Sequence, residues 1–168
     1  MKTLVLGGAR SGKSRYAEKI VEQTKQQVIY IATAAAGDQE MQRRIEMHQS
    51  QRPEDWLLIE EPLNLTGALQ KSDNKINVIL VDCLTLWLSN VLAEDDRSVE
   101  ARVDELVDTV AQLKTELVLV SNEVGQGIVP MGELTRKFVD ESGRMHQKLA
   151  QVCEHVVFIT AGLPQKLK

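Results

Sequence analysis

The sequence has no long apolar run, no block of basic residues and few aromatic residues. A membrane-spanning helix needs about 18 or more consecutive apolar residues, and no run of that length occurs. Lys and Arg number 20 against 24 Asp and Glu, which gives a formal net charge of −4, and aromatic residues make up 4% of the chain. Polynucleotides and anionic membranes attract positive patches, and single strands also stack on aromatic rings. We therefore expect neither nucleic acid nor a membrane as a partner.

Cysteine is also scarce, since only Cys83 and Cys153 occur. Both lie in apolar segments, and their spacing matches no metal-binding pattern. The expectation is two buried free thiols, which a reducing compartment keeps reduced. The stretch from Met1 to Leu6 is shorter than the apolar core of a secretory signal. These observations predict a cytoplasmic protein.

The most informative stretch present is glycine-rich and runs from Gly7 to Ser14. It follows an apolar run typical of a strand and precedes a segment typical of a helix. A glycine, four residues and then Gly-Lys-Ser between a strand and a helix form the signature of a phosphate-binding loop (P-loop). A chance match to a glycine-rich turn is the alternative, and the flanking segments weigh against it. The predicted nucleotide-binding residues are Gly7, Gly8, Ala9, Arg10, Ser11, Gly12, Lys13 and Ser14.

Each part of this loop has a chemical role in the prediction. The glycines allow consecutive backbone N–H groups to point at phosphate, and the N-terminus of the following helix adds further donors. Lys13 is expected to reach the outer phosphates as a catalytic residue, and the Ser14 hydroxyl is expected to help hold Mg²⁺.

Segments typical of strands and of helices alternate along the rest of the chain. Apolar or β-branched runs predict strands at 2–6, 27–32, 56–60, 78–81, 117–120 and 156–159, with a short antiparallel edge strand after them. Helical spacing, caps and prolines predict helices at 13–25, 38–50, 62–70, 83–93, 98–114 and 132–152. This alternation implies an α/β fold with a mostly parallel sheet and helices on both faces. No repeat or linker divides the chain, so residues 1–168 are expected to form one domain.

Ligands of open α/β sheets bind at the carboxyl ends of the strands, which makes the residues there candidates for the site. Asp82 follows the apolar run at 78–81, which is the Walker B pattern, and such an acid binds Mg²⁺ directly or through water. Asp82 also precedes a predicted helix, so an N-cap is an alternative role, and both roles can hold together. Ala32-Thr33-Ala34 and Glu60 are the equivalent positions on two other strands.

Asn122 and Glu123 follow the strand predicted at 117–120. A carboxylate at this place either orients or deprotonates an attacking hydroxyl group, or it fixes the following glycine-containing loop by hydrogen bonds. The spacing favours neither interpretation.

Of the three histidines, His146 and His155 are expected to be ordinary exposed or half-exposed side chains. His48 lies on a polar predicted helix, and the arginines near it are Arg43, Arg44 and Arg52. A neutral imidazole is a competent nucleophile toward phosphorus, and arginines hold phosphate groups. On the residues alone, a solvated helix face is the favoured interpretation.

Further motifs go beyond a generic P-loop: Tyr30-Ile31-Ala32-Thr33, Arg44-Ile45, His48, Arg52-Pro53, Trp56, Glu60 and the run from Ser121 to Pro130. With residues 7–14 they closely resemble the bifunctional adenosylcobinamide kinase / adenosylcobinamide-phosphate guanylyltransferase family of cobalamin biosynthesis. The resemblance extends over essentially the whole chain. It implies a RecA-like sheet of about seven strands and a homotrimer.

The resemblance also implies two activities. The family phosphorylates adenosylcobinamide with ATP or GTP, and then transfers GMP from GTP through a GMP-histidine intermediate to give adenosylcobinamide-GDP. By its position before Arg52-Pro53, His48 matches the guanylylated histidine. The implied nucleotide contacts outside the P-loop are Ala32, Thr33, Ala34, Gln49, Ser50, Gln51, Arg52, Glu60 and Asp82.

One stretch departs from the family pattern, because Gln49-Ser50-Gln51 stands where a basic, glycine-containing stretch is frequent. Side-chain contacts with guanine at these positions are therefore left open. The alternative enzymes are a guanylyltransferase without kinase activity and a plain small-molecule kinase in which His48 is incidental. The alternative outside enzymes is a nucleotide-dependent switch or a RecA-like strand-exchange module.

Overall fold

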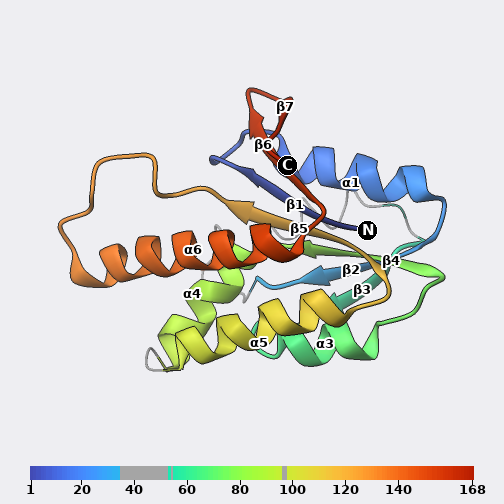
Figure 1. Cartoon of the computed structure of the whole chain (residues 1–168), viewed down its shortest axis with the longest axis horizontal. Coiled ribbons are helices and arrows are strands. Elements are labelled where there is room, and N and C mark those ends of the chain that lie inside the picture. The colour runs from blue at the N-terminus through green and yellow to red at the C-terminus, as the bar shows by residue number, and fades with distance from the viewer. Residues whose placement is uncertain (35–52, 54, 96–97) are drawn as a thin grey trace.

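The computed structural model describes residues 1–34, 53, 55–95 and 98–168. In these residues a seven-stranded sheet has the strand order β3-β2-β4-β5-β1-β6-β7 (Figure 1). The β6–β7 pair is antiparallel and the other neighbouring strands are parallel. The strands are β1 (Lys2–Gly7), β2 (Gln27–Ala32), β3 (Leu57–Glu60), β4 (Asn77–Asp82), β5 (Glu116–Asn122), β6 (His155–Thr160) and β7 (Leu163–Lys166).

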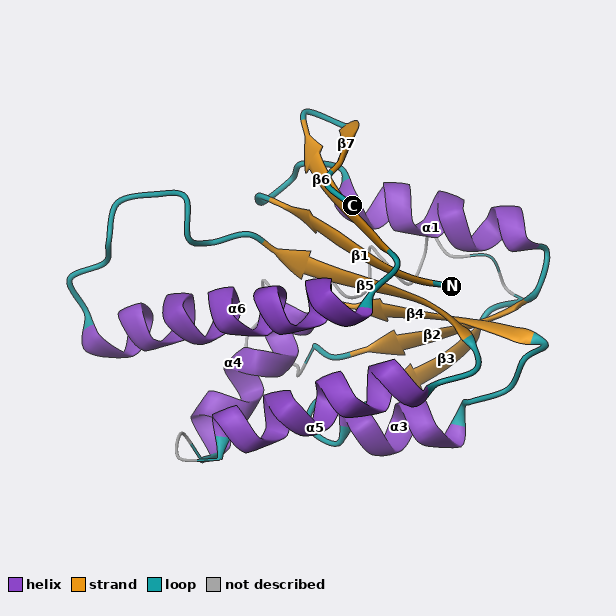
Figure 2. Ribbon diagram, viewed as in Figure 1, coloured by secondary structure: helices purple, strands orange, loops and turns teal. Residues whose placement is uncertain are grey.

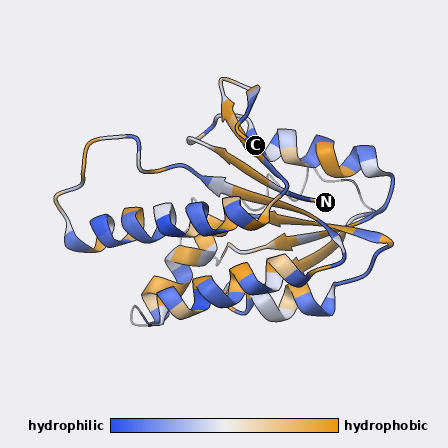
Figure 3. Ribbon diagram, viewed as in Figure 1, coloured by the Kyte–Doolittle hydropathy of each residue, from blue (hydrophilic) through white to orange (hydrophobic). Residues whose placement is uncertain are grey.

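The described helices lie on both faces of the sheet (Figure 2). They are α1 (Lys13–Thr24), α3 (Leu65–Lys71), α4 (Leu84–Glu94), α5 (Val99–Gln112) and α6 (Glu133–Val152). Two separate clusters of buried side chains fill the spaces between sheet and helices. Ala17 and Val21 of α1 pack in one cluster, and apolar side chains of the other four helices pack in the second. The central strands are therefore covered on both faces, which explains their continuous apolar runs (Figure 3).

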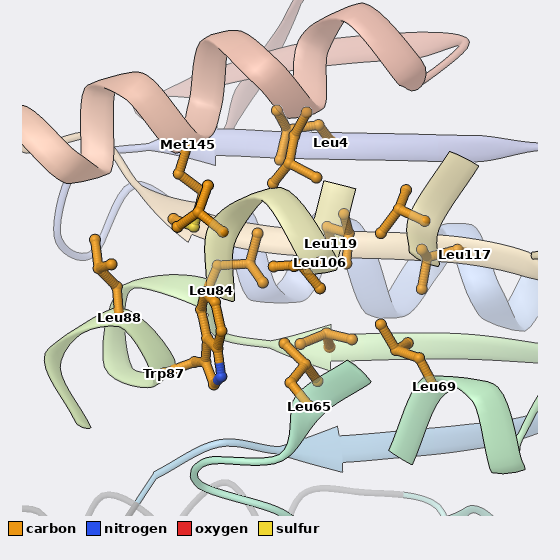
Figure 4. Close-up of a cluster of buried hydrophobic side chains, with 14 of the residues drawn as sticks. Leu4, Leu65, Leu69, Leu84, Trp87, Leu88, Leu106, Leu117, Leu119 and Met145 are labelled. Carbon is orange, nitrogen blue, oxygen red and sulfur yellow. The ribbon is translucent and has the colours of Figure 1, made fainter. Parts of the chain in front are cut away.

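The larger cluster joins four helices to the middle of the sheet. Figure 4 shows side chains of α3, α4, α5 and α6 that converge on Leu4 of β1 and on Leu117 and Leu119 of β5. Trp87 is fully buried here, and its indole N–H donates to the carbonyl of Leu63 at 2.9 Å. Burial of a leucine side chain contributes about 1.5–3 kcal/mol, so this cluster holds the four helices firmly against the sheet.

The structure confirms the predicted fold class, including the antiparallel edge, and corrects one helix start. The helix expected from Pro62 begins at Leu65, because Asn64 is its N-cap and accepts a hydrogen bond from the N–H of Gly67 at 3.1 Å. The helix expected over 38–50 lies outside the described residues. None of the described helices combines the length and the apolar character that a membrane crossing requires.

Candidate nucleotide-binding site

The P-loop leaves the carboxyl end of β1, and two of its glycines are required by their surroundings. Gly12 has a φ of 95°, and a Cβ there would lie 3.2 Å from the Cα of Gly162. A Cβ on Gly7 would lie 2.7 Å from the carbonyl oxygen of Ile159. Any side chain at these positions would displace backbone, so the chain must keep glycine at both.

Backbone hydrogen bonds hold the loop in place from within and from the neighbouring hairpin. The N–H of Ser11 donates to the carbonyl of Gly8 at 3.3 Å, and the N–H of Gly162 donates to the carbonyl of Ser11 at 2.8 Å. Gly162 belongs to the turn between β6 and β7, so the antiparallel edge of the sheet supports the loop.

Lys13 begins α1 and is buried, and its ammonium group donates to the carbonyl of Gly8 at 3.1 Å. Burial lowers the pKa of Lys13, and the nearby Asp82 carboxylate and Cys83 oppose this shift. The Lys13 amine therefore lies near Asp82 and Cys83 and is largely shielded from bulk water. A buried cation at this place is suited to bind an anionic ligand.

Asp82 ends β4, is half-buried, and accepts a hydrogen bond from the Tyr30 hydroxyl at 3.3 Å. The N-cap interpretation is wrong, because Cys83 occupies the cap position of α4 and no side-chain capping hydrogen bond is present in this described helix. The Asp82 carboxylate instead interacts electrostatically with the Lys13 ammonium group. The Walker B role of Asp82 stays a prediction.

The oxygen donors at this edge fit a magnesium ion that is shared with phosphates. Mg²⁺ is bound by one or two carboxylates or hydroxyls together with substrate phosphates. Asp82 and Ser14 supply such oxygens, and within the described ranges no cluster of three or more His, Cys, Asp or Glu side chains forms a closed metal cage. Ser11 Oγ and Asn122 Oδ1 are buried with no hydrogen-bond partner in the described part of the chain, so they are available to a ligand.

Thr33 is fully buried, and its hydroxyl is already used within the protein. It donates to the carbonyl of Cys83 at 2.7 Å and accepts from the N–H of Cys83 at 2.9 Å. Its own carbonyl accepts from the Asn90 amide at 2.8 Å. Thr33 therefore ties the end of β2 to the residue that follows Asp82, and it acts as a support for the site.

The other predicted contacts lie at the same edge or outside the described residues. Ala32 is buried at the end of β2, Ala34 is half-buried, and Glu60 is exposed at the end of β3. The N–H of Glu61 donates to the carbonyl of Ala32 at 2.9 Å, which joins these two strand ends. The residues outside the described part are Arg43, Arg44, His48, Gln49, Ser50, Gln51 and Arg52.

Glu123 lies directly beside the start of the P-loop. Its N–H donates to the carbonyl of Gly7 at 3.0 Å, and its Oε1 accepts from the N–H of Gly125 at 2.5 Å. The hydrogen bond to the glycine-containing loop, one of the two roles considered for this carboxylate, is thus present. The other role, toward an attacking hydroxyl group, stays a prediction. The second carboxylate oxygen, Oε2, lies 3.7 Å from Nδ1 of His146.

His146 is buried, so the expectation of an exposed or half-exposed side chain is wrong. Only 6% of the residue is exposed, and Nε2 forms a 2.7 Å hydrogen bond with Ser121 Oγ. The buried residues of α6 are Ser142, Met145, His146 and Leu149, so the helical period places His146 on the core face. That spacing was the signal in the sequence. His155 is half-exposed at the start of β6, as expected.

The two cysteines confirm the expectation of free buried thiols. Burial raises the pKa of Cys83 and of Cys153 to about 11 in each case. Neither thiol is therefore an effective nucleophile near neutral pH, because the thiolate is the reactive form.

Comparison with known structures shows the fold. The RadB recombinase matches with a TM-score of 0.56 and 17% identity, over 94% of this chain and 73% of that one. The flagellar accessory protein FlaH from Methanocaldococcus jannaschii matches with a TM-score of 0.52 and 13% identity, over 99% and 77%. At these identities the likeness concerns the fold alone.

Comparison with known sequences is more specific. The "Bifunctional adenosylcobalamin biosynthesis protein CobP" of Pseudomonas aeruginosa is 49% identical over 100% of this chain and 98% of its own length. The "Bifunctional adenosylcobalamin biosynthesis protein CobU" of Escherichia coli K12 is 36% identical over the full length of both chains. The profile of the family described as "Cobinamide kinase / cobinamide phosphate guanyltransferase" matches residues 3–167. The chain therefore belongs to the cobinamide kinase / cobinamide phosphate guanyltransferase family.

Proposed function

We propose that this chain is a bifunctional enzyme of adenosylcobalamin biosynthesis. It phosphorylates adenosylcobinamide with ATP or GTP, and it then transfers GMP from GTP to that phosphate to give adenosylcobinamide-GDP. The observation that carries the proposal is a P-loop with a buried Lys13 near Asp82, in a chain that matches the family over residues 3–167.

In the kinase reaction the substrate hydroxyl attacks the γ-phosphorus, and the protein positions the groups and stabilises charge. The backbone N–H groups of residues 7–14 and the N-terminus of α1 bind phosphate oxygens. Lys13 neutralises charge on the outer phosphates, and its burial strengthens that interaction.

Magnesium is the proposed cofactor, and Ser14 and Asp82 are the residues that would hold it. When bound, the ion supplies positive charge to the phosphates between which the bond breaks. Asp82 is kept in place by the Tyr30 hydroxyl and by the bonds of Thr33 to Cys83.

In the transferase reaction His48 is the proposed nucleophile at the α-phosphorus of GTP. Pyrophosphate leaves, GMP is held on the imidazole, and the phosphate of the substrate then displaces the histidine. His48 lies outside the described residues, and the resemblance of its sequence context to the family supports this role.

The nucleotide contacts beyond the P-loop are proposed from the same resemblance. They are Ala32, Thr33, Ala34, Gln49, Ser50, Gln51, Arg52 and Glu60. The position of Ala32 and Glu60 at the carboxyl ends of β2 and β3 supports their part in it. The part of Thr33 in nucleotide binding would be indirect. Its hydroxyl is bonded to the backbone of Cys83, so it would fix the position of the residue that follows Asp82.

The assembly, the domain and the location are also proposals. We infer a homotrimer, one domain over residues 1–168 and a cytoplasmic location. One sheet that joins β1 to β7 supports the single domain, and two buried free thiols are compatible with a reducing cytoplasm. Light scattering tests the trimer, and a mass of 18.8 kDa at micromolar concentration would contradict it.

The deciding experiment is intact-mass spectrometry after incubation with Mg²⁺ and GTP. A mass increase of one GMP is expected in the wild type and in His155→Ala, and it should be absent in His48→Ala. The adduct should be labile in acid and stable in base, as a phosphoramidate is. Absence of the adduct from the wild type would favour a plain kinase, and GTP hydrolysis without an acceptor would favour a switch. An adduct that maps to another residue would refute the role of His48.

A further inference from the structure

A chain of buried polar side chains lies behind the carboxyl end of β5. His146 Nε2 is 2.7 Å from Ser121 Oγ, and Ser121 Oγ is 3.2 Å from Thr85 Oγ1. Thr85 Oγ1 in turn accepts from the N–H of Asn122 at 2.7 Å. This series of hydrogen bonds thus connects α6, β5 and the first turn of α4. At its end, Nδ1 of His146 has no hydrogen-bond partner among the described residues.

The hydrogen bonds of this series are consistent with one direction of donation, from Thr85 through Ser121 to His146. Thr85 Oγ1 already accepts from a backbone N–H, so its own hydrogen can go to Ser121 Oγ. The Ser121 hydroxyl then donates to Nε2 of His146, which leaves the ring proton on Nδ1. Nδ1 lies 3.7 Å from Glu123 Oε2. The opposite tautomer would turn a lone pair toward that carboxylate, so the Glu123 charge favours the same proton position.

The Glu123 carboxylate is hydrogen-bonded on one side and has the His146 ring on the other. The N–H of Gly125 donates to Oε1, and Nδ1 of His146, which has no hydrogen-bond partner among the described residues, lies 3.7 Å from Oε2, beyond hydrogen-bond distance but close enough for electrostatic attraction. The side chain keeps 20% exposure, and the Glu123 backbone is bonded to Gly7 at the start of the P-loop. Burial lowers the pKa of His146, and Glu123 opposes this shift.

The order serine, histidine and glutamate also occurs in hydrolases, where serine is the nucleophile. Ser121 is fully buried, so its hydroxyl cannot reach a substrate. Glu123 is the member of the chain with solvent access, and it lies beside the P-loop. Glu123 is therefore the member of this series that a substrate can reach.

We propose that Glu123 accepts the proton of the attacking substrate hydroxyl in the kinase reaction, and that His146 is a positioning residue that orients this carboxylate. This inference rests on the proposed function. The hydroxyl oxygen forms a bond to the γ-phosphorus, and the bond to the bridging oxygen breaks. The nucleoside diphosphate leaves with that electron pair, and the hydroxyl proton moves to Glu123.

Glu123→Gln tests the proton acceptor, because the amide keeps the shape and cannot take the proton. Kinase kcat should fall about 100-fold, with the KM for nucleotide changed by less than about threefold. The transferase reaction, started from adenosylcobinamide phosphate, uses an anionic attacking oxygen, so its rate should fall far less. Glu133→Gln, at the exposed start of α6, is the matched control. Equal loss of both rates, or an unchanged kinase rate, would overturn the proposal.

Two substitutions of His146 separate positioning from simple support. His146→Asn places an amide N–H near the Nδ1 position and keeps a donor for Glu123. His146→Gln places its amide near the Nε2 position, so it keeps the contact with Ser121 and loses that donor. Kinase kcat should fall about tenfold in the glutamine variant and much less in the asparagine variant. Equal kcat values in two folded variants would refute the positioning role.

The design also separates this inference from the proposed function. A wild-type protein that does not phosphorylate adenosylcobinamide contradicts the proposed function itself. An active wild type with an equally active Glu123→Gln contradicts the inference alone. If either His146 variant fails to fold, the half-exposed Glu123 variant still decides whether the carboxylate takes the proton.

Discussion

Two sets of polar side chains meet at the carboxyl edge of the sheet, and they are built in opposite ways. The ligand set consists of Ser11, Lys13, Asp82 and Asn122. Ser11 Oγ and Asn122 Oδ1 are buried with no partner among the described residues, and the ammonium of Lys13 is desolvated. Such groups destabilise a fold unless something binds to them.

The hydroxyl set consists of Thr33, Thr85 and Ser121, and its members are bonded within the protein. Thr33 both donates to and accepts from the backbone of Cys83. Thr85 and Ser121 bond to each other, to the N–H of Asn122 and to His146. These side chains therefore stabilise the edge by themselves.

The difference indicates where function and stability are separated in this protein. Substitutions in the ligand set should reduce activity with little effect on stability, because Ser11 Oγ and Asn122 Oδ1 have no partner to lose among the described residues and the Lys13 and Asp82 side chains each have one hydrogen bond to the described residues. Substitutions in the hydroxyl set should reduce stability, because they leave buried donors or acceptors unpaired.

The largest effect is expected for Lys13→Ala. Both activities should fall by about 10³-fold or more, since the charge on the outer phosphates is lost. The melting temperature should change little, because removal of a buried charge offsets the loss of the hydrogen bond to the carbonyl of Gly8. Steady-state assays and calorimetry measure this, with the exposed Lys19→Ala on the same helix as the control. A large fall in melting temperature would break the distinction between the two sets.

Asp82→Asn should reduce turnover by about 10- to 100-fold at limiting Mg²⁺, because the charge opposite the cation is lost. Higher Mg²⁺ should restore part of the rate. A titration of rate against Mg²⁺ measures the effect, and Asp108→Asn, exposed on α5, serves as the control. An unchanged titration curve would remove Asp82 from the proposed metal site.

Thr33→Val should destabilise the fold by about 2–3 kcal/mol, because the N–H and carbonyl of Cys83 lose their partner. Urea unfolding measures the change, and Thr109→Val, a buried threonine of α5, is the matched comparison. The nucleotide affinity of the folded fraction should change little. A stable variant with weak nucleotide binding would instead move Thr33 into the ligand set.

The smallest effect concerns the pH dependence of stability. The pKa of His146 is lowered in the folded protein, so below about pH 6.5 the unfolded chain binds a proton that the folded protein does not. Stability should therefore fall with pH from about 6.5 downward, by at most about 1.4 kcal/mol per pH unit. Urea unfolding between pH 5.5 and 7.5 should show a steeper loss for the wild type than for His146→Asn. Identical slopes would mean that the burial of His146 does not affect its titration.

Local signals predicted the fold and named residues 7–14 and Asp82 as candidates because each of these signals is contiguous in the sequence. Residues 7–14 form one motif, and Asp82 directly follows an apolar run that had to be a buried strand. The start of α3 differs from the prediction because Pro62 and Asn64 both fit a helix start, and the hydrogen bond from Gly67 to Asn64 selects Asn64. His146 differs from the prediction because the helical period of α6 places this polar residue on the face that packs against the core.

The sequence by itself therefore determined the order of strands and helices, the P-loop and the acid beside it. The tertiary structure alone decided which distant polar groups meet. Thr33 reaches Cys83 because β2 pairs with β4, and Glu123 reaches the P-loop because β5 pairs with β1. His146 reaches Ser121 because α6 packs on this part of the sheet. Hydrogen bonds between residues far apart in sequence depend on strand order and helix packing, and no local pattern encodes either of them.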